Sequence, residues 1–149
     1  MALQTGAGAT LALSAAAPAT QDAAGYAALT FTEVGQIEKI GAIGATFAKT
    51  DFQPLKGPKQ KLKGSPDYGS LQPSYAHDDS DAGQTLLRTA ANDETNKLYS
   101  MKATYQDGSK RYAQVRVFSA PETIDGADPV VMVTPTIEIC TKVIPVAAT

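Results

Sequence analysis

The sequence predicts a mainly β fold, a β-sandwich or open barrel that carries one α-helix. Three observations predict this fold class. Residues 28–52 are rich in β-branched and aromatic side chains broken by glycines, residues 99–117 alternate around an Asp-Gly turn, and residues 130–143 alternate between apolar and polar side chains. By contrast, one segment, residues 81–92, has the apolar periodicity of a helix.

Composition limits the class of protein. The 149 residues are enough for one domain, and 43% hydrophobic residues suffice for a single core. The net charge of -2 gives no reason to expect a dedicated nucleic-acid binder, which normally carries a strongly basic face. Lys39 is the first basic side chain, so the basic start of a secretory signal is missing, and no run reaches the roughly 18 apolar residues of a membrane helix. We expect a soluble, intracellular chain without membrane insertion.

The first half of the chain predicts an arm, two strands and a loop. Residues 1–26 are rich in alanine, glycine and threonine, so we interpret them as an arm that is mobile alone and becomes ordered on a partner. Strands are predicted near residues 28–40 and 45–52. Residues 53–76 follow as a long loop, because four prolines interrupt any regular ladder, and such loops are usually functional or disordered.

The acidic stretch before residue 82 admits two interpretations, a metal site or the start of a helix. A calcium-binding loop beginning at Asp79 needs an oxygen ligand at its fifth position and a glutamate at its twelfth, where the chain has Gly83 and Ala90. A helix over residues 81–92 fits better. Asp81 caps its first turn, and Gln84 reaches back to the amide of Asp81. One face of this helix is apolar and carries Leu86, Leu87, Ala90 and Ala91.

Residues 99–117 predict a β-hairpin whose register follows from its side chains. A two-residue loop would mix apolar and polar side chains on both faces. A three-residue loop of residues 106–108, with Gly108 in the left-handed conformation, sets Tyr99 opposite Val115 and Met101 opposite Ala113 on one apolar face. The other face then collects Ser100, Lys102, Thr104, Lys110, Tyr112, Gln114 and Arg116.

The last long strand is predicted over residues 130–143, with Pro135 marking an edge position or a bulge. Residues 144–149 remain as a C-terminal tail. One face of the strand is apolar and the other carries Met132, Thr134, Thr136, Glu138 and Cys140.

No catalytic constellation is evident. The chain has one histidine, His77, and one cysteine, Cys140, and it lacks a nucleophile elbow and a phosphate loop. One Cys and one His leave a structural zinc site two ligands short. We therefore expect no enzyme, no catalytic residue, no metal and no cofactor.

Four motifs follow one another in a characteristic order: a strand with Glu-Val-Gly (Phe31–Gly41), a helix entered through Asp and Gln (Asp81–Asp93), an Asp-Gly hairpin (Tyr105–Pro121) and a closing strand (Asp128–Pro145). In this order, over roughly residues 28–145, the chain resembles the major tail tube protein of long-tailed, non-contractile (siphovirus-type) bacteriophages. That family often ends its final strand with Thr-Gly, where this chain has Cys140, Thr141 and Lys142.

The resemblance implies a structural virion protein with a single tail-tube domain over residues 1–149. Its copies would form hexameric rings, in which inner strands join into one continuous barrel, and the rings would stack into the hollow tube that conducts phage DNA into the host. The implied partners are other copies, a tape-measure protein, a tail terminator and distal tail proteins, with double-stranded DNA passing through transiently. Assembly would take place in the host cytoplasm and the product would be part of the virion.

In this family the long loop and the terminal arms commonly bridge neighbouring subunits and rings. The resemblance therefore makes interface candidates of Leu3, Leu11, Leu13, Pro54, Leu55, Lys56, Lys59, Lys61, Lys63, Asp78 and Asp79. A basic loop and an acidic patch would let identical copies recognise one another. A DNA conduit should not hold its cargo, so the face bearing Lys102, Lys110 and Arg116 is expected to point away from the channel. The candidates for lining it are Thr134, Thr136 and Glu138.

Other readings stay open. The chain could be a tail terminator, a head-tail connector, or the tube of a contractile tail or type VI secretion system. It could also be a monomeric β-sandwich module that binds a small ligand or a carbohydrate, which predicts a concave pocket lined with aromatic side chains. The absence of tryptophan and an aromatic content of 7% count against that module.

Overall fold

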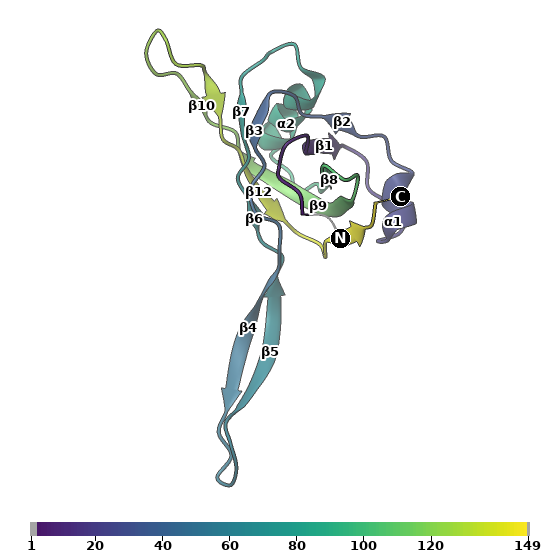
Figure 1. Cartoon of the computed structure of the whole chain (residues 1–149), viewed down its shortest axis with the longest axis vertical. Coiled ribbons are helices and arrows are strands. Elements are labelled where there is room, and N and C mark those ends of the chain that lie inside the picture. The colour runs from purple at the N-terminus through teal and green to yellow at the C-terminus, as the bar shows by residue number, and fades with distance from the viewer. Residues whose placement is uncertain (1–2, 149) are drawn as a thin grey trace.

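A computed structural model describes residues 3–148 and has thirteen strands in three antiparallel sheets and two helices within that range (Figure 1). The predicted mainly β class is confirmed. The main sheet has the order β2 (Thr32–Glu33), β1 (Thr10–Ser14), β8 (Tyr99–Thr104), β9 (Lys110–Ser119), β12 (Thr136–Ile139) and β6 (Ser70–Leu71), and β13 (Ile144–Val146) pairs with β9. The second sheet has the order β10 (Glu122–Thr123), β11 (Met132–Val133), β7 (Ser74–Ala76) and β3 (Ile37–Lys39). The third consists of β4 (Thr46–Phe52) and β5 (Gln60–Asp67).

The core lies between the main sheet, the four-stranded sheet and helix α2 (Ala82–Asn92). Every large side chain at its centre is fully buried: Leu11, Leu13, Leu71, Tyr75, Leu87, Met101, Val115 and Ile137. Because these residues come from both sheets and from the helix, one continuous apolar cluster holds the body of the molecule together.

The hairpin of β8 and β9 has the predicted register. Tyr99 lies opposite Val115 and Met101 opposite Ala113, and the side chains of all four are buried. The amide of Tyr105 donates to the carbonyl of Ser109 at 2.8 Å, which leaves three residues in the loop, and Gly108 has a φ of 93°. The three-residue turn is therefore confirmed.

Helix α2 also begins and ends where the sequence predicts. The Asp81 carboxylate accepts a hydrogen bond from the amide of Gln84 at 2.9 Å, and Leu87 and Ala90 face the core. The predicted bond from the Gln84 side chain back to Asp81 is wrong. The amide of Asp81 instead donates to the carbonyl of Asp78 at 3.2 Å.

The Gln84 side chain is fully buried and joins three backbone groups from outside the helix. Its Oε1 accepts from the amide of Asp78 at 2.9 Å, and its Nε2 donates to the carbonyls of Gly35 at 3.0 Å and Ala76 at 2.9 Å. Buried backbone groups need hydrogen-bond partners, and the Gln84 carboxamide supplies them to three groups outside the helix, which explains why it does not bond to Asp81.

The prediction of a mobile arm over residues 1–26 is wrong for most of its length, and residues 1–2 lie outside the described residues. Strand β1 lies inside the main sheet between β2 and β8, and Leu11 and Leu13 on it are 0% exposed. A second helix, α1 (Ala23–Ala27), was not predicted; it is capped by Asp22, whose carboxylate accepts from the amide of Gly25 at 2.8 Å. A short alternating strand placed in a sheet buries enough apolar surface to be ordered, whatever the composition of its flanks.

The segment before and within α1 covers the polar face of the β8–β9 hairpin. The Tyr26 ring stacks on Tyr112 with ring centroids 5.2 Å apart, and Gln21 donates to the side chain of Gln114 at 2.7 Å. Ser100 donates to the carbonyl of Ala16 at 2.7 Å. The polar side chains of this face are therefore partly internal, as their mutual hydrogen bonds allow.

The C-terminal region departs from the prediction in two ways. The predicted strand of residues 130–143 is two strands in different sheets, β11 and β12, with Pro135 between them. Proline cannot donate to a ladder, so the chain changes sheet at this point. Residues 144–146 of the predicted tail form β13, with Ile144 opposite Tyr112, and Thr149 lies outside the described residues.

Candidate assembly interface

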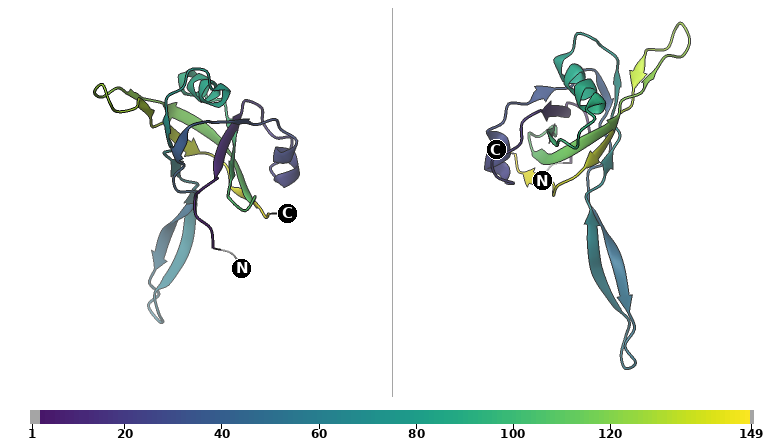
Figure 2. Two further views of the ribbon diagram at one scale, coloured as in Figure 1. Left: turned by 45° about the horizontal axis from the view of Figure 1, so that its top comes forward. Right: turned by 180° about the vertical axis from the view of Figure 1, so that it is seen from behind.

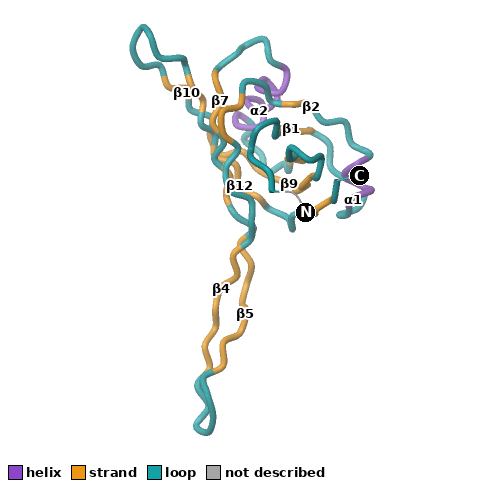
Figure 3. The backbone as a smooth tube through the Cα atoms, viewed as in Figure 1, coloured by secondary structure: helices purple, strands orange, loops and turns teal. Residues whose placement is uncertain are grey.

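Strands β4 and β5 form a ribbon that projects from the body of the molecule (Figures 1 and 2). This corrects the prediction of a loop over residues 53–76: β5 occupies residues 60–67, and residues 53–59 form the tip (Figure 3). Pro66 lies in β5 opposite Phe47, where the pairing is irregular. Each strand of a two-stranded ribbon has one edge free of hydrogen bonds, so proline is tolerated there.

The ribbon has two chemically different faces. Lys49 lies opposite Lys63 and Asp51 opposite Lys61, and directly opposite residues point to the same face, so these four charged side chains lie together. On the other face Thr50 lies opposite Leu62, and Phe52 is the diagonal neighbour of Leu62. Phe52 and Leu62 are 55% and 54% exposed, so this apolar face has no cover within the chain.

The tip is held by its own glutamine. The side-chain amide of Gln53 donates to the carbonyls of Pro54 at 3.0 Å and Gly57 at 3.2 Å, and Gly57 has a φ of 119°. Leu55 stands fully exposed at this turn. Of the interface candidates, Pro54, Leu55, Lys56, Lys59, Lys61 and Lys63 are thus all brought together on the ribbon.

The remaining candidates lie elsewhere. Leu3 is 90% exposed near the N-terminus, whereas Leu11 and Leu13 are buried in the core of their own chain and cannot contact another copy. Asp78 accepts from the amide and hydroxyl of Ser80. These hydrogen bonds, the hydroxyl's first, hold the pKa of Asp78 below its ordinary value.

Asp79 has partners within the chain as well. Its carboxylate lies 3.0 Å from Nε2 of His77 and 3.6 Å from a guanidinium nitrogen of Arg88. Its side chain is 84% exposed, so these pairs contribute little to stability. A role of Asp78 and Asp79 between copies stays a prediction.

One of the three channel-lining candidates, Glu138, lies beside a basic residue of the neighbouring strand. Thr134 is exposed, and Thr136 and Glu138 are half-buried on β12. Glu138 lies opposite Arg116, which puts both side chains on the same face of the main sheet. The predicted sorting, with Arg116 away from the channel and Glu138 toward it, is therefore wrong for this pair, while Thr134 and Thr136 stay predictions as lining residues.

A second segment projects at the opposite end of the molecule from the ribbon (Figures 1 and 2). It consists of residues 121–131 between β9 and β11, and it starts at β10, which pairs with β11. Ile124 and Val130 on it are 75% and 63% exposed. We call it the acidic loop, because it carries Glu122, Asp125 and Asp128 and no basic residue.

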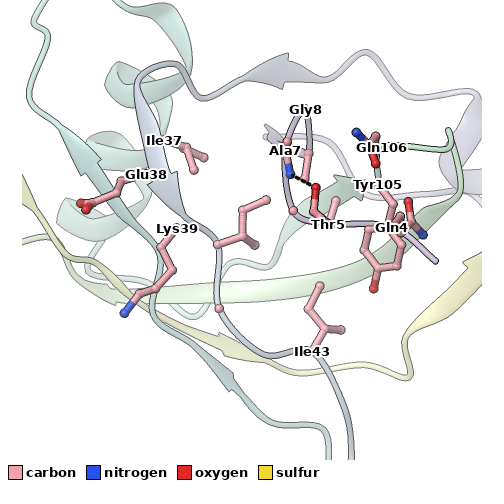
Figure 4. Close-up of a pocket in the computed structure, with 15 residues that line it drawn as sticks. Gln4, Thr5, Ala7, Gly8, Ile37, Glu38, Lys39, Ile43, Tyr105 and Gln106 are labelled. Atoms are coloured by element: carbon pink, nitrogen blue, oxygen red, sulfur yellow. Dashed lines mark hydrogen bonds between the residues drawn. The ribbon is translucent and has the colours of Figure 1, made fainter.

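A groove of about 740 Å³ lies beside the N-terminal segment (Figure 4). It is lined by residues 4–9, by residues 37–41 and 43, and by Ala103 of β8 with Tyr105 and Gln106 after it. Ile37, Ile43 and Tyr105 give it an apolar wall, while Glu38 and Lys39 point away from its centre. Over residues 3–148 no cluster of three or more His, Cys, Asp or Glu side chains is close enough to hold a metal ion. Within the same range, no helix combines the length and apolar character needed to span a membrane.

No protein-family model matches the chain, and no curated protein does. Solved structures do. A chain of the anti-feeding prophage baseplate, solved by cryo-electron microscopy with 6-fold symmetry, aligns with a TM-score of 0.70 at 7% identity over 100% of this chain and 99% of its own length.

Two further similar structures come from an extracellular contractile injection system, PVC. A chain of its sheath/tube terminator has a TM-score of 0.60 at 9% identity and covers 92% of this chain and 93% of its own. A chain of its sheath-tube complex has a TM-score of 0.53 at 11% identity over 75% and 88%. At these identities the likeness concerns the fold, and this chain shares that fold with subunits of phage-tail-like assemblies.

Proposed function

We propose that this chain is a structural subunit of a phage tail or a phage-tail-like injection system, and that its copies assemble into rings and stacked tubes. The observation that carries the proposal is the free-standing ribbon of β4 and β5. An isolated two-stranded ribbon is at best marginally stable in water, and one with exposed Phe52 and Leu62 is a liability unless a partner covers it.

The open edges of the sheets support the same proposal. The main sheet is flanked by β2 and β6, and the four-stranded sheet by β10 and β3. Joining copies edge to edge around a ring pairs such edges, and a ring that closes has none left. The similarity to a baseplate chain over the full length of this chain is consistent with such an assembly.

The finer assignment has two candidates, each favoured by a different observation. The order of the sequence motifs favours the tube of a siphovirus-type tail, which conducts DNA. The shared fold with chains of a sheath/tube terminator and of a sheath-tube complex favours, to a comparable degree, a tube or terminator of a contractile system. A tape-measure protein, a tail terminator and distal tail proteins are the partners proposed for the first candidate.

Negative-stain electron microscopy of the purified chain over a range of concentrations, with light scattering alongside, tests the assembly. Hollow tubes of constant diameter support a tube subunit, and rings that do not stack support a terminator or connector. A chain that remains monomeric at every concentration, also in the presence of preformed tails, contradicts the proposal and favours a monomeric binding module.

Immunogold labelling of particles from cells that make the chain separates the finer candidates. Label along a thin, bare tail supports the siphovirus-type tube. Label confined to sheathed particles, exposed after the sheath contracts, supports a contractile system. We propose no enzymatic role, and replacing His77 and Cys140 by alanine is expected to leave assembly and fold unchanged.

A further inference from the structure

The two projections of the molecule carry opposite charge. Residues 46–67, the ribbon and its tip, contain five lysines against two aspartates, a net charge of +3. The acidic loop contains Glu122, Asp125 and Asp128, a net charge of -3. The whole chain has a net charge of only -2, so the opposite charges of the two projections reflect a separation of positive and negative residues between the two ends of the molecule.

The charges of the ribbon are available to a partner. Asp51 lies 3.7 Å from the Lys49 ammonium and 3.4 Å from that of Lys59. One carboxylate is thus shared by two lysines and neutralises only one of their two charges. The Lys63 ammonium lies over the Phe47 ring at 4.6 Å from its centroid, a contact that leaves it a full positive charge. The lysines are exposed, and the Asp51 side chain is 32% exposed, so the lysines need no further desolvation before they meet a partner.

The charges of the acidic loop are available as well. Glu122 lies 3.8 Å from Nδ1 of His77, at the base of the loop. Asp125 and Asp128 stand further out, in a stretch where every residue is exposed. Ile124 and Val130 accompany them, as Phe52 and Leu62 accompany the lysines of the ribbon.

We infer that the acidic loop of one copy is the docking site for the β4–β5 ribbon of a second copy. This inference rests on the proposed function and names the contact through which copies stack. Both projections combine exposed apolar side chains with charges of opposite sign, so their contact buries apolar surface and places lysines against carboxylates.

The position of the projections gives the contact its polarity. The ribbon and the acidic loop lie at opposite ends of the longest axis of the molecule (Figure 1). A contact between two different surfaces is heterologous, and because these two lie at opposite ends of the molecule, each copy that docks presents a new free ribbon or loop to the next, as a growing stack requires. Asp78 and Asp81 are less suited to receive the ribbon, because they already cap turns and α2 within their own chain.

Charge reversal tests the contact. The variant K61E/K63E reverses the ribbon and the variant D125K/D128K reverses the loop, and each places like charges against the unchanged partner surface. Each exposed ion pair contributes up to about a factor of five in affinity, and reversal also adds repulsion. We expect the concentration at which half of the subunits are stacked to rise by roughly tenfold or more for each variant, less so in 0.5 M salt, which screens exposed charges.

The variant with all four substitutions restores complementarity with the signs exchanged and is expected to stack like the wild type. The control K97E/K142E reverses two exposed lysines outside both projections and is expected to change little. Circular dichroism melts establish that each variant is folded, and sedimentation velocity with negative-stain microscopy measures stacking.

The outcomes separate this inference from the function on which it rests. Wild-type tubes that persist unchanged in K61E/K63E and D125K/D128K overturn the inference and leave the proposed function standing. A wild type that remains monomeric at every concentration, also in the presence of preformed tails, overturns both. A photo-crosslinking amino acid in place of Leu55 gives an independent readout. Adducts within residues 121–131 of another copy support the contact, and adducts confined to other segments refute it.

Discussion

Replacing the buried Gln84 by methionine is expected to destabilise the chain severely although it preserves volume and helix propensity. The substitution removes three hydrogen bonds of 2.9 to 3.0 Å, to Asp78, Gly35 and Ala76. A lost hydrogen bond that leaves a partly buried backbone group unpaired costs about 1–1.5 kcal/mol or more. Three of them amount to about 3–5 kcal/mol, a large part of the 5–15 kcal/mol by which domains are typically stable.

Urea unfolding followed by circular dichroism measures this loss. Gln72→Met is the matched control, because Gln72 is exposed and the same chemical change there should alter the free energy of unfolding by less than about 0.5 kcal/mol. If Gln84→Met loses less than about 1 kcal/mol, the carboxamide does not join the segments as described and the reasoning fails.

Three further predictions concern packing, titration and the ribbon. Gly83→Ala should lower the free energy of unfolding by more than about 2 kcal/mol despite alanine's helix propensity, because the added Cβ would overlap the Glu33 carbonyl. Gly44→Ala is the control, because a Cβ at Gly44 meets open space. Equal melting temperatures for the two variants would contradict the prediction. Burial raises the pKa of Tyr75 to about 12, so the contribution of Tyr75 to stability is complete below pH 10 and is lost as the pH rises toward 12. In urea titrations over that pH range, the Tyr75→Phe variant should lose roughly 2 kcal/mol less stability than the wild type. Parallel stability curves for the two proteins would refute this prediction. Phe52→Ser with Leu62→Ser should leave the melting temperature unchanged and abolish assembly, as sedimentation would reveal; retained assembly would show that the apolar face of the ribbon is not an interface.

The parts of the fold that local signals determine could be predicted from the sequence. The register of β8 and β9 followed from the alternation around Gly108, and the bounds of α2 followed from Asp81 and the apolar stripe ending at Ala91. In each case turn or cap chemistry and side-chain pattern agree over neighbouring residues, so no distant contact is needed.

The parts that depend on distant partners could not be predicted. Leu11 and Leu13 alternate within only five strand residues, and their burial comes from β8, far along the chain. The prolines of residues 53–76 indicate a loop because proline is excluded from the central strands of a sheet, but both strands of a two-stranded ribbon are edge strands, where proline is tolerated. The alternation of Lys61, Leu62 and Lys63 was the signal for β5 that the prolines hid.

The candidate interface was partly predictable for the same reason. Its residues on the ribbon became candidates through the family resemblance, and the lysines and prolines that gather there agreed with that choice. The acidic loop was missed, because its acidic residues are spread through a segment without periodicity. Only the structure shows that this loop lies at the opposite end of the molecule from the ribbon.

The position of β1 between β2 and β8 affects the order of events during folding. Strand β1 is synthesised well before its partner β8, which ends at Thr104, so Leu11 and Leu13 remain unburied until β8 has been made. Contacts so distant in sequence slow folding. Until β1 enters, β8 presents an unpaired edge to solvent, and a β1 from another chain fits that edge equally well. Strand exchange between copies is thus expected in refolding at high concentration, before the sheet is complete.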